Sequence, residues 1–536
     1  MVRHSLRMMA GTFLSRVLGL AREVLTAALF GATRQLDAFL VAYTLANLSR
    51  RLLAEGALSA AFVPEFSRTL AKDGPASARS LARQIFSVLL AATVIVTAAG
   101  MIAAPILVRV MAPGFDAEGT RAAVSLTRLM FPFLVFISVA ALAMGVLNSL
   151  DCFFVPAIAP ALSNGVFIVF LAIVTLRWGV WGLGYAVLLG GVTQMVLQWA
   201  WSAKKGVLLV PAMPRRDNEA LSRAMRLFLP YAAGLSLNQL IPLISRMLGS
   251  FLEEGAISVL NYADRVLQLP LGLFVIAISQ AILPQLSRQL LAGEEDFFQG
   301  VREALRYGLF IVLPVALGMV LFSGEIIHLL FFRAAFGEWA WRGTAGALAM
   351  YSLGLPGMAC STILLRALYA RGLPREAMIV TAFSVGANVV FSLLLIRPMG
   401  INGLALASSL AFSGTALLTW RLLPGQKSAE SLFRRDWVIP LALGLGLMGL
   451  LLVCLKILFP YPLYGSILSK SSWMALPLLL GAGAYALVTW KAGSPEWAWI
   501  VEAFKGRKPK TVNRESVGPC IVNRKPKAVN RKSEGP

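Results

Sequence analysis

Apolar stretches recur along almost the whole chain and are separated by short polar segments. About fourteen of them are as long as the roughly 20 apolar residues that a helix needs to cross a bilayer. The predicted spans cover residues 8–30, 36–62, 84–111, 122–150, 154–176, 179–201, 224–250, 256–284, 304–331, 343–370, 376–396, 401–421, 437–458 and 472–491. The pattern therefore predicts an all-α, polytopic membrane protein of about fourteen transmembrane helices.

Lysine and arginine are distributed unevenly between the loops that join these spans. They gather after the second, sixth and twelfth spans, at Arg68, Lys72, Arg79, Arg83, Lys204, Lys205, Arg215, Arg216, Lys427, Arg434 and Arg435. The loops on the opposite side, such as GATRQ at 31–35 and FLEEG at 251–255, are poorer in basic residues. Because basic residues in short loops stay on the cytoplasmic side, both chain termini are predicted to be cytoplasmic.

The composition agrees with a chain that is solvated by lipid. Of the 536 residues, 58% are hydrophobic and only 14% are charged, whereas soluble domains are about 25% charged. The net charge of +23 is largely accounted for by the basic loops, so it does not indicate binding to nucleic acid. The four cysteines and two histidines lack the spacing of metal ligands or of a disulfide framework, so no metal site is predicted.

Three landmarks occur twice along the chain, in the same order. The matching pairs are FVPEFSR at 62–68 with ILPQLSR at 282–288, Pro132 with Pro356, and VWGLGYA at 180–186 with INGLALA at 401–407. Each pair is separated by about 220 residues, which indicates an internal duplication of six spans. Because six is an even number, both halves insert in the same orientation, as in transporters that bind their substrates between two lobes.

The duplication divides the chain into regions. We predict an N-lobe at 1–203 with the first six spans, a C-lobe at 204–424 with the next six, and a segment at 425–495 with two additional spans. The remainder, 496–536, is a basic tail that repeats itself as KPKTVNRESVGP and KPKAVNRKSEGP. Its polar, proline-bearing composition predicts disorder, and its charge would suit anionic membrane lipids.

The first span carries charges within its apolar stretch. Its segment SRVLGLARE contains Ser15, Arg16, Arg22 and Glu23. Ser15 and Arg22 are seven residues apart, and so are Arg16 and Glu23. Because seven residues make nearly two helical turns, the four side chains form one polar stripe along the helix.

Three further spans carry polar residues of the same kind. They are Asp37, Asn47, Arg50, Arg51 and Glu55 on the second span, Asn164 on the fifth, and Asp264 and Arg265 on the eighth. Arg51 and Glu55 are four residues apart, which is the spacing of an ion pair on one helix face. The polar residues of different spans are therefore candidates for one shared site.

Arginine is costly inside a membrane, at about 2.5–3.5 kcal/mol near the centre of a span. Arg16, Arg22, Arg50 and Arg265 would together cost on the order of 10 kcal/mol if they faced lipid, so we expect them to face a wet cavity. Guanidinium groups suit phosphate or carboxylate, which indicates an anionic, phosphate-bearing substrate. The membrane potential, worth about 2.3 kcal/mol per charge per 100 mV, is a candidate driving force. Salt bridges that only hold helices together are the alternative interpretation.

The quoted segments resemble one family. SRVLGLARE, DAFLVAYTLANLSRRLLAEGALSAAFVPEF, APGF, YADRVLQLPLG, ILPQLSR, RALYA and GLALASSLA are similar to motifs of the MurJ (MviN) lipid II flippases, over about residues 8–421. That family lies in a superfamily that also holds multidrug and polysaccharide-lipid exporters. The resemblance implies two six-helix lobes around a central cavity, two C-terminal helices that form a groove for a polyprenyl tail, and a transporter rather than an enzyme.

The resemblance also implies a substrate and a site. The substrate would be lipid II, an undecaprenyl-pyrophosphate-linked disaccharide-pentapeptide, moved from the inner to the outer leaflet of the bacterial cytoplasmic membrane for cell-wall synthesis. Arg16, Arg22, Arg50 and Arg265 would bind its pyrophosphate, supported by the polar residues Ser15, Glu23, Asp37, Asn47, Arg51, Glu55, Asn164 and Asp264. Lipid II and membrane lipids are the expected partners, the cell-wall synthesis machinery is a further candidate, and no cofactor is expected.

Several positions depart from the family pattern. Glu23 stands where the family commonly has an aspartate. Some members bind a sodium ion in the second lobe through carboxylates, but the matching positions here are Ser245 and Ser392, which argues against a sodium site. The family's RGAF motif reads RAAF at 333–336.

Other functions stay open on the residues alone. A drug or ion antiporter, or a flippase for another lipid-linked oligosaccharide, would share this architecture, although an antiporter favours a cavity dominated by carboxylates. A polytopic membrane enzyme would need a substantial external loop, and the connections here are short. A scaffold that transports nothing would leave the intramembrane arginines unexplained. Pro64, Pro284 and Gly272 are candidate points of helix flexing or fixed kinks.

Overall fold

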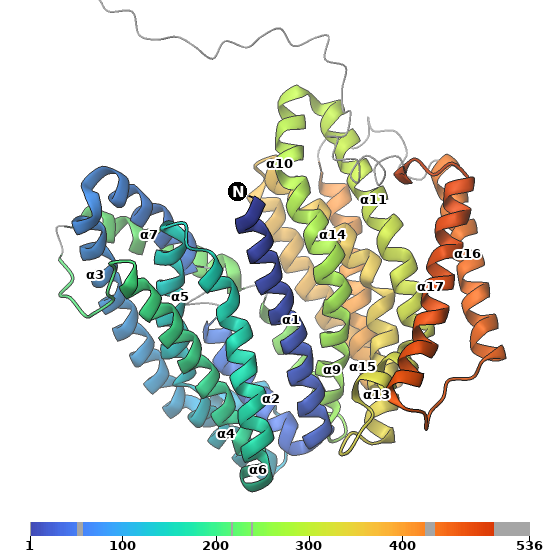
Figure 1. Cartoon of the computed structure of the whole chain (residues 1–536), viewed down its shortest axis with the longest axis horizontal. Helices are drawn as coiled ribbons and strands as arrows, with labels where there is room; N and C mark the ends of the chain where they lie inside the picture. Colours follow the sequence, from blue (N-terminus) through green and yellow to red (C-terminus); the bar gives the residue numbers. More distant parts are fainter. Residues whose placement is uncertain (1, 51–56, 216–217, 237–238, 424–434, 498–536) are drawn as a thin grey trace, which may run out of the picture.

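The computed structural model describes residues 2–50, 57–215, 218–236, 239–423 and 435–497 (Figure 1). Every regular element in these ranges is helical, so the predicted all-α, polytopic fold class is confirmed. In chain order the elements are α1 (Val2–Phe30), α2 (Arg34–Arg50), α3 (Ala57–Met111), α4 (Ala117–Met130), α5 (Phe133–Ser149), α6 (Phe154–Lys204), α7 (Glu219–Ser236), α8 (Leu240–Gly249), α9 (Ala256–Pro270), the π-helix η3 (Leu271–Val275), α10 (Ile276–Ala292), α11 (Glu294–Leu321), α12 (Ser323–Phe331), α13 (Glu338–Leu353), α14 (Leu355–Ala370), α15 (Pro374–Leu422), α16 (Arg435–Leu458) and α17 (Ile467–Lys491).

The helices follow the predicted spans closely, but their number is not the number of membrane crossings. By length and composition, 8 stretches among the described residues could cross a membrane, or 9 if the bent pair α13 and α14 forms one span. The stretches Ala61–Met111 and Pro374–Leu422 contain 51 and 49 residues, whereas about 20 suffice for one crossing. Each therefore holds more helix than one crossing uses, and the count of fourteen stays a prediction.

Glycines fold the long helices α6 and α15 back on themselves at equivalent places. In α6, Gly179 has φ 51° and ψ −137°, and in α15, Gly400 has φ 53° and ψ −125°. Glycine adopts this conformation at little cost because it has no Cβ. Past the first break, Gly190 lies against Ser163, and past the second, Asn388 donates to Ser408. The breaks are 221 residues apart, so the predicted duplication is visible in the backbone.

The predicted seventh span, 224–250, is not one continuous helix in the described residues. Its first part, α7, packs against α3 of the N-lobe, whereas its second part, α8, packs against α15 of the C-lobe. An ion pair reinforces the first contact, because Arg223 Nε of α7 lies 3.0 Å from the carboxylate of Glu65 on α3. The start of the predicted C-lobe is thus attached to the other lobe.

Among the residues that the structure describes, apolar burial joins the lobes at one end only. In Figure 1 the two groups of helices converge at the end of α1 that is remote from the N-terminus. There, one hydrophobic core contains residues of both lobes, such as Ala27 and Leu36 together with Ile257 and Phe331. Toward the N-terminal end of α1, each lobe has a core of its own. We call these the closed end and the open end.

The last two helices, α16 and α17, pack on the outer side of the C-lobe against α11 (Figure 1). The hydroxyl of Tyr485 on α17 donates to the carbonyl of Phe310 at 2.8 Å. Lys456 at the end of α16 lies 2.8 Å from the buried carboxylate of Glu325 on α12. These contacts fix the helix pair to the C-lobe and away from the lobe interface.

Candidate functional site: an arginine-lined cavity between the lobes

The closed end is held by hydrogen bonds that cross from one lobe to the other. Asp37 on α2 is 2% exposed, and its carboxylate accepts bonds from the backbone N–H groups of Gly255 and Ser258 at 2.9 and 2.7 Å. The Ser258 hydroxyl donates to the same carboxylate at 2.6 Å. Because these donors lie at the start of α9, a side chain of the N-lobe caps a helix of the C-lobe.

Two more bonds reinforce this end. The Tyr262 hydroxyl on α9 donates to the carbonyl of Gly31 at 3.1 Å, and the N–H of Ala335 donates to the carbonyl of Ala28 at 3.0 Å. The two backbone segments approach so closely that a Cβ on Gly31 would lie 2.2 Å from the carbonyl oxygen of Ala335. The lobes are therefore in direct backbone contact at the closed end.

Above the closed end, a cavity of about 620 Å³ separates the lobes. Its polar walls come from α1, α6 and α9: Arg16, Arg22 and Glu23, then Asn164, then Asp264, Arg265 and Gln268. Three of the four predicted substrate-binding arginines therefore share one cavity, with two from the N-lobe and one from the C-lobe.

Glu23 lies at the centre of this arrangement and is 8% exposed. Arg22 Nη2 contacts its carboxylate at 2.8 Å, and Arg265 Nε of the other lobe lies 3.5 Å from the same oxygen. Arg265 Nε makes no hydrogen bond within the described part of the chain. One carboxylate thus faces two guanidinium groups, and the local charge is positive.

Arg22 is fixed in place by further contacts within the N-lobe. Its Nη1 donates to the side-chain oxygen of Asn164 at 3.3 Å, and its guanidinium lies 5.0 Å from the centre of the Phe167 ring, a distance that suits a cation–π contact. Asn164 in turn donates to the carbonyl of Ser15 at 3.2 Å. The predicted polar stripe of α1 therefore continues onto α6.

Of the two cavity arginines on α1, Arg16 is the more accessible, and it lies against η3. A Cβ added to Gly272 would lie 2.5 Å from Arg16 Nη1, so the π-helix admits the guanidinium only because residue 272 is glycine. Pro270 ends α9 immediately before η3, and π-helical turns of this kind are frequent at functional sites. The sequence marked Gly272 as a flexing point, and the structure adds its contact with Arg16.

The other predicted site residues lie elsewhere or outside the description. Asp37 is in the interlobe contact at the closed end rather than in the cavity wall. Asn47 is half-buried on α2. Arg50 ends α2, but its side chain lies outside the described residues, as do Arg51 and Glu55. Their predicted roles stay predictions.

Sequence reasoning did not identify several residues of the site. Asn261 and Tyr262 face the same small space as Arg22 and Glu23, but neither type of residue is unusual on a helix. Arg246 on α8 was missed although a signal existed, because it is an arginine within an apolar segment, LIPLISRMLG. The cost argument that singled out the other arginines applies equally to it.

No metal site is evident in the geometry. Within the described residues, no group of three or more His, Cys, Asp or Glu side chains could hold a metal ion. Of the two positions discussed for sodium, Ser245 lines a second pocket in the C-lobe, and Ser392 is buried on α15. The prediction against a sodium site stays a prediction.

A polytopic helical chain with two repeated lobes, joined at one end around a charged central cavity, is a membrane transporter. A family model described as lipid II flippase MurJ matches residues 26–477, and the chain belongs to this family. A probable lipid II flippase MurJ of Rhizobium tropici is 34% identical over 525 residues, covering 94% of this chain and 97% of that protein. The lipid II flippase MurJ of Burkholderia cenocepacia is 36% identical over 370 residues, covering 67% and 71%.

Solved structures show the same fold. A structure described as lipid II flippase MurJ, inward closed conformation, matches with a TM-score of 0.77 at 22% identity, covering 93% of this chain and 99% of that one. An inward-facing multidrug resistance MATE family transporter of the MOP superfamily matches with a TM-score of 0.63 at 16% identity, covering 78% and 96%.

Proposed function

We propose that this protein moves lipid II from the inner to the outer leaflet of the bacterial cytoplasmic membrane by alternating access. The observation that carries the proposal is the cavity in which Arg16 and Arg22 of one lobe meet Arg265 of the other. Family membership supplies the identity of the substrate, and the arginine cluster supplies a chemical reason for it.

The charges of the cavity suit a pyrophosphate. Three arginines face the two carboxylates of Glu23 and Asp264, so the described part of the cavity keeps a positive charge. The guanidinium group offers several N–H donors in a fixed plane, which matches phosphate oxygens. Because Glu23 already orients Arg22 and Arg265, an incoming pyrophosphate would meet positioned donors rather than flexible ones.

The proposed transport cycle follows from the difference between the closed end and the open end of the lobe interface. In the proposed cycle the open end faces the cytoplasm, as the basic loops predict, and the headgroup enters there while the polyprenyl tail stays in lipid beside α16 and α17. The lobes then rock, the bonds of Asp37 break, and the headgroup leaves on the other side. The membrane potential would bias this step because the cavity carries net charge. No covalent chemistry is involved, so the protein would not be an enzyme.

The test is a measurement of headgroup accessibility in cells whose own lipid II flippase can be switched off. The wild-type protein, Arg22→Ala and Arg265→Ala are expressed, and an external enzyme that cleaves the pyrophosphate link reports arrival of the headgroup outside. We expect cleavage with the wild type and at least about a tenfold loss with either variant, because each removes charged hydrogen bonds worth about 1.5–3 kcal/mol. Arg397→Ala, an exposed arginine at the break of α15, serves as the control and should transport normally.

Each alternative result has a meaning. If a correctly inserted wild type gives no cleavage, the function is wrong. If the two cavity variants work as well as Arg397→Ala, the arginines are structural and the site is wrong.

The second candidate is a drug or ion antiporter, because the fold also matches multidrug transporters. It would be favoured if the wild type moved no lipid II but exported organic cations. The excess of arginine over carboxylate in the cavity weighs against cationic drugs.

A further inference from the structure

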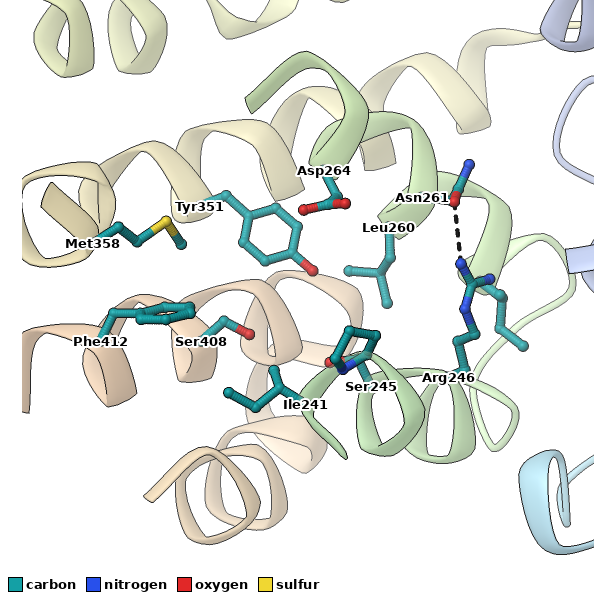
Figure 2. Close-up of a pocket in the computed structure, with 12 residues that line it drawn as sticks. Ile241, Ser245, Arg246, Leu260, Asn261, Asp264, Tyr351, Met358, Ser408 and Phe412 are labelled. Atoms are coloured by element: carbon teal, nitrogen blue, oxygen red, sulfur yellow. Dashed lines mark hydrogen bonds between the residues drawn. The ribbon is translucent and has the colours of Figure 1, made fainter. Parts of the chain in front are cut away.

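A second, smaller pocket lies within the C-lobe, beside the central cavity. It encloses about 230 Å³ between α8, α9, α13, α14 and α15, and we call it the side chamber. Figure 2 shows Arg246 and Ser245 reaching it from α8, Asn261 and Asp264 from α9, and Tyr351 from α13. A volume below the usual 300–1,000 Å³ of a ligand pocket suits one end group rather than a whole headgroup.

Arg246 is the unusual residue of this chamber. Its Nη2 donates to the side-chain oxygen of Asn261 at 3.2 Å (Figure 2). Its Nη1 is buried and has no hydrogen-bond partner in the described part of the chain, and no ion pair of Arg246 occurs there either. A buried guanidinium donor without a partner is unfavourable, so the chamber offers an open donor to an anionic group.

The chamber adjoins the central cavity. Asp264, Met358 and Phe412 line both spaces, and Asn261, which orients Arg246, also faces Arg22 and Glu23. Arg265 follows Asp264 on the same helix. A molecule held at Arg265 could therefore extend an arm past Asp264 into the chamber.

The polar groups of the chamber favour a particular kind of anion. Asn261 and Asp264 are three residues apart on α9, so they project from one face with Cβ atoms about 5–6 Å apart. The carboxylate of Asp264 lies beside Tyr351 in the wall of the same chamber (Figure 2), where it would repel a dianion such as phosphate. A monoanionic carboxylate fits better, and an ammonium group on the same arm would be attracted to Asp264. The hydroxyls of Tyr351 and Ser408 can bond either group.

We infer that the side chamber binds the carboxylate of an amino-acid-like group, with Arg246 as its partner. This inference rests on the proposed function, under which that group is the peptide arm of the headgroup whose pyrophosphate sits at the arginine cluster. Arg246 is then a specificity-determining residue that binds the peptide, whereas Arg16, Arg22 and Arg265 bind the pyrophosphate. A free amino acid or dipeptide carries the same chemistry and is the other source of the carboxylate.

The test compares four ligands on the purified, full-length protein in nanodiscs. The first is a short-chain prenyl-pyrophosphate-linked disaccharide-pentapeptide, the second is the same molecule with amidated peptide carboxylates, the third lacks the peptide, and the fourth is free alanyl-alanine. The wild type should bind the first ligand about tenfold more tightly than the second. Arg246→Gln should abolish that difference and leave the affinity for the third ligand within about twofold of the wild-type value.

Two further variants keep the result interpretable. Arg246→Lys retains the charge but not the fork of donors, and it should recover part of the preference for the first ligand. Arg397→Gln, an exposed arginine of the same lobe, should behave as the wild type. The melting temperature of each variant is measured alongside, so that loss of folding is not read as loss of binding.

The outcomes separate the inference from the proposed function. If the wild type binds the first three ligands equally well, the side chamber does not bind the peptide carboxylate. The inference is then wrong, while the flippase function stands. If Arg246→Gln weakens binding of the third ligand as much as binding of the first, Arg246 acts on the arginine cluster and the inference is again wrong. If only alanyl-alanine binds, and it needs Arg246, the chamber stands as a carboxylate site and the proposed function falls.

Discussion

The closed and open ends of the interface between the lobes are held in different ways. At the closed end the carboxylate of Asp37 bonds to two backbone N–H groups of the opposite lobe, and one apolar core covers the contact. At the open end the lobes keep separate cores. There, α7 of the predicted C-lobe packs on the core of the N-lobe, and its partly exposed Arg223 pairs with the buried Glu65.

This difference indicates which end of the interface costs more free energy to open. A buried carboxylate that satisfies several donors is costly to disrupt, because each donor then loses a charged partner. An ion pair whose arginine is partly exposed contributes less, because water can replace the arginine at small cost. Opening the closed end is therefore the expensive step of the cycle, and substrate binding has to help drive it. The predictions below test this difference in order of expected effect.

Asp37→Ala should have the largest effect. It leaves the N–H groups of Gly255 and Ser258 without their carboxylate, and charged hydrogen bonds contribute about 1.5–3 kcal/mol. Spin labels at Val110 and Arg342, which are exposed near the closed end in different lobes, should report a longer and broader distance distribution. Headgroup transport should fall at least about tenfold.

Glu118→Ala is the control, because Glu118 is an exposed carboxylate at the same end of the molecule. A distance distribution that is unchanged in Asp37→Ala would show that the apolar core alone holds the closed end.

Gly272→Ala should weaken pyrophosphate binding without loss of stability. The added Cβ would lie 2.5 Å from Arg16 Nη1, and the flexible arginine would move away before the helix unfolds. We expect a three- to tenfold loss of affinity for a short-chain prenyl pyrophosphate, which corresponds to about 0.7–1.4 kcal/mol, at an unchanged melting temperature. Gly446→Ala, which meets no atom within 4 Å, should change neither. A large drop in melting temperature would place Gly272 in the core instead.

Tyr262→Phe should weaken the closed end mildly. It removes the hydrogen bond to the carbonyl of Gly31 but keeps the ring contacts with Phe331 and Phe336 at 5.1 and 5.5 Å. A neutral hydrogen bond contributes about 1 kcal/mol, so the melting temperature should fall by a few degrees, with transport largely retained. Complete loss of transport would give this hydroxyl a role beyond holding the lobes together.

Glu65→Gln at the open end should have the smallest effect. The Glu65 carboxylate is buried, but its partners Arg223 and Arg68 have side chains that are 42% and 65% exposed, so water screens both ion pairs and each should contribute about 1 kcal/mol or less. The melting temperature should change by no more than about two degrees. A loss as large as that of Asp37→Ala would remove the proposed difference between the two ends.

The sequence was informative where a signal is local. Helical periodicity placed Arg16, Arg22 and Glu23 on one stripe, and the cost of burying charge predicted that the stripe faces a polar cavity. The motif offset of about 220 residues predicted a repeat that the glycine breaks at Gly179 and Gly400 make visible.

Contacts between distant residues were beyond local reasoning. Asp37 looked like one more polar residue of the second span, and its partner Ser258 is 221 residues away. The packing of α7 against the N-lobe and of α8 against α15 likewise depends on residues far apart in the sequence, such as Arg223 and Glu65. The free-energy cost of an arginine inside a membrane could have predicted a role for Arg246. Its Nη1 donor without a hydrogen-bond partner is visible only in the structure.

The glycine breaks of α6 and α15 also bear on how the chain enters the membrane. Each joins two predicted spans with almost no polar loop between them, so we expect the two spans of each pair to enter the lipid together. The fifth and sixth spans, and likewise the eleventh and twelfth, would leave the translocon as ready-made helical hairpins. Biogenesis of each lobe would then end with the docking of such a hairpin onto helices that are already in place.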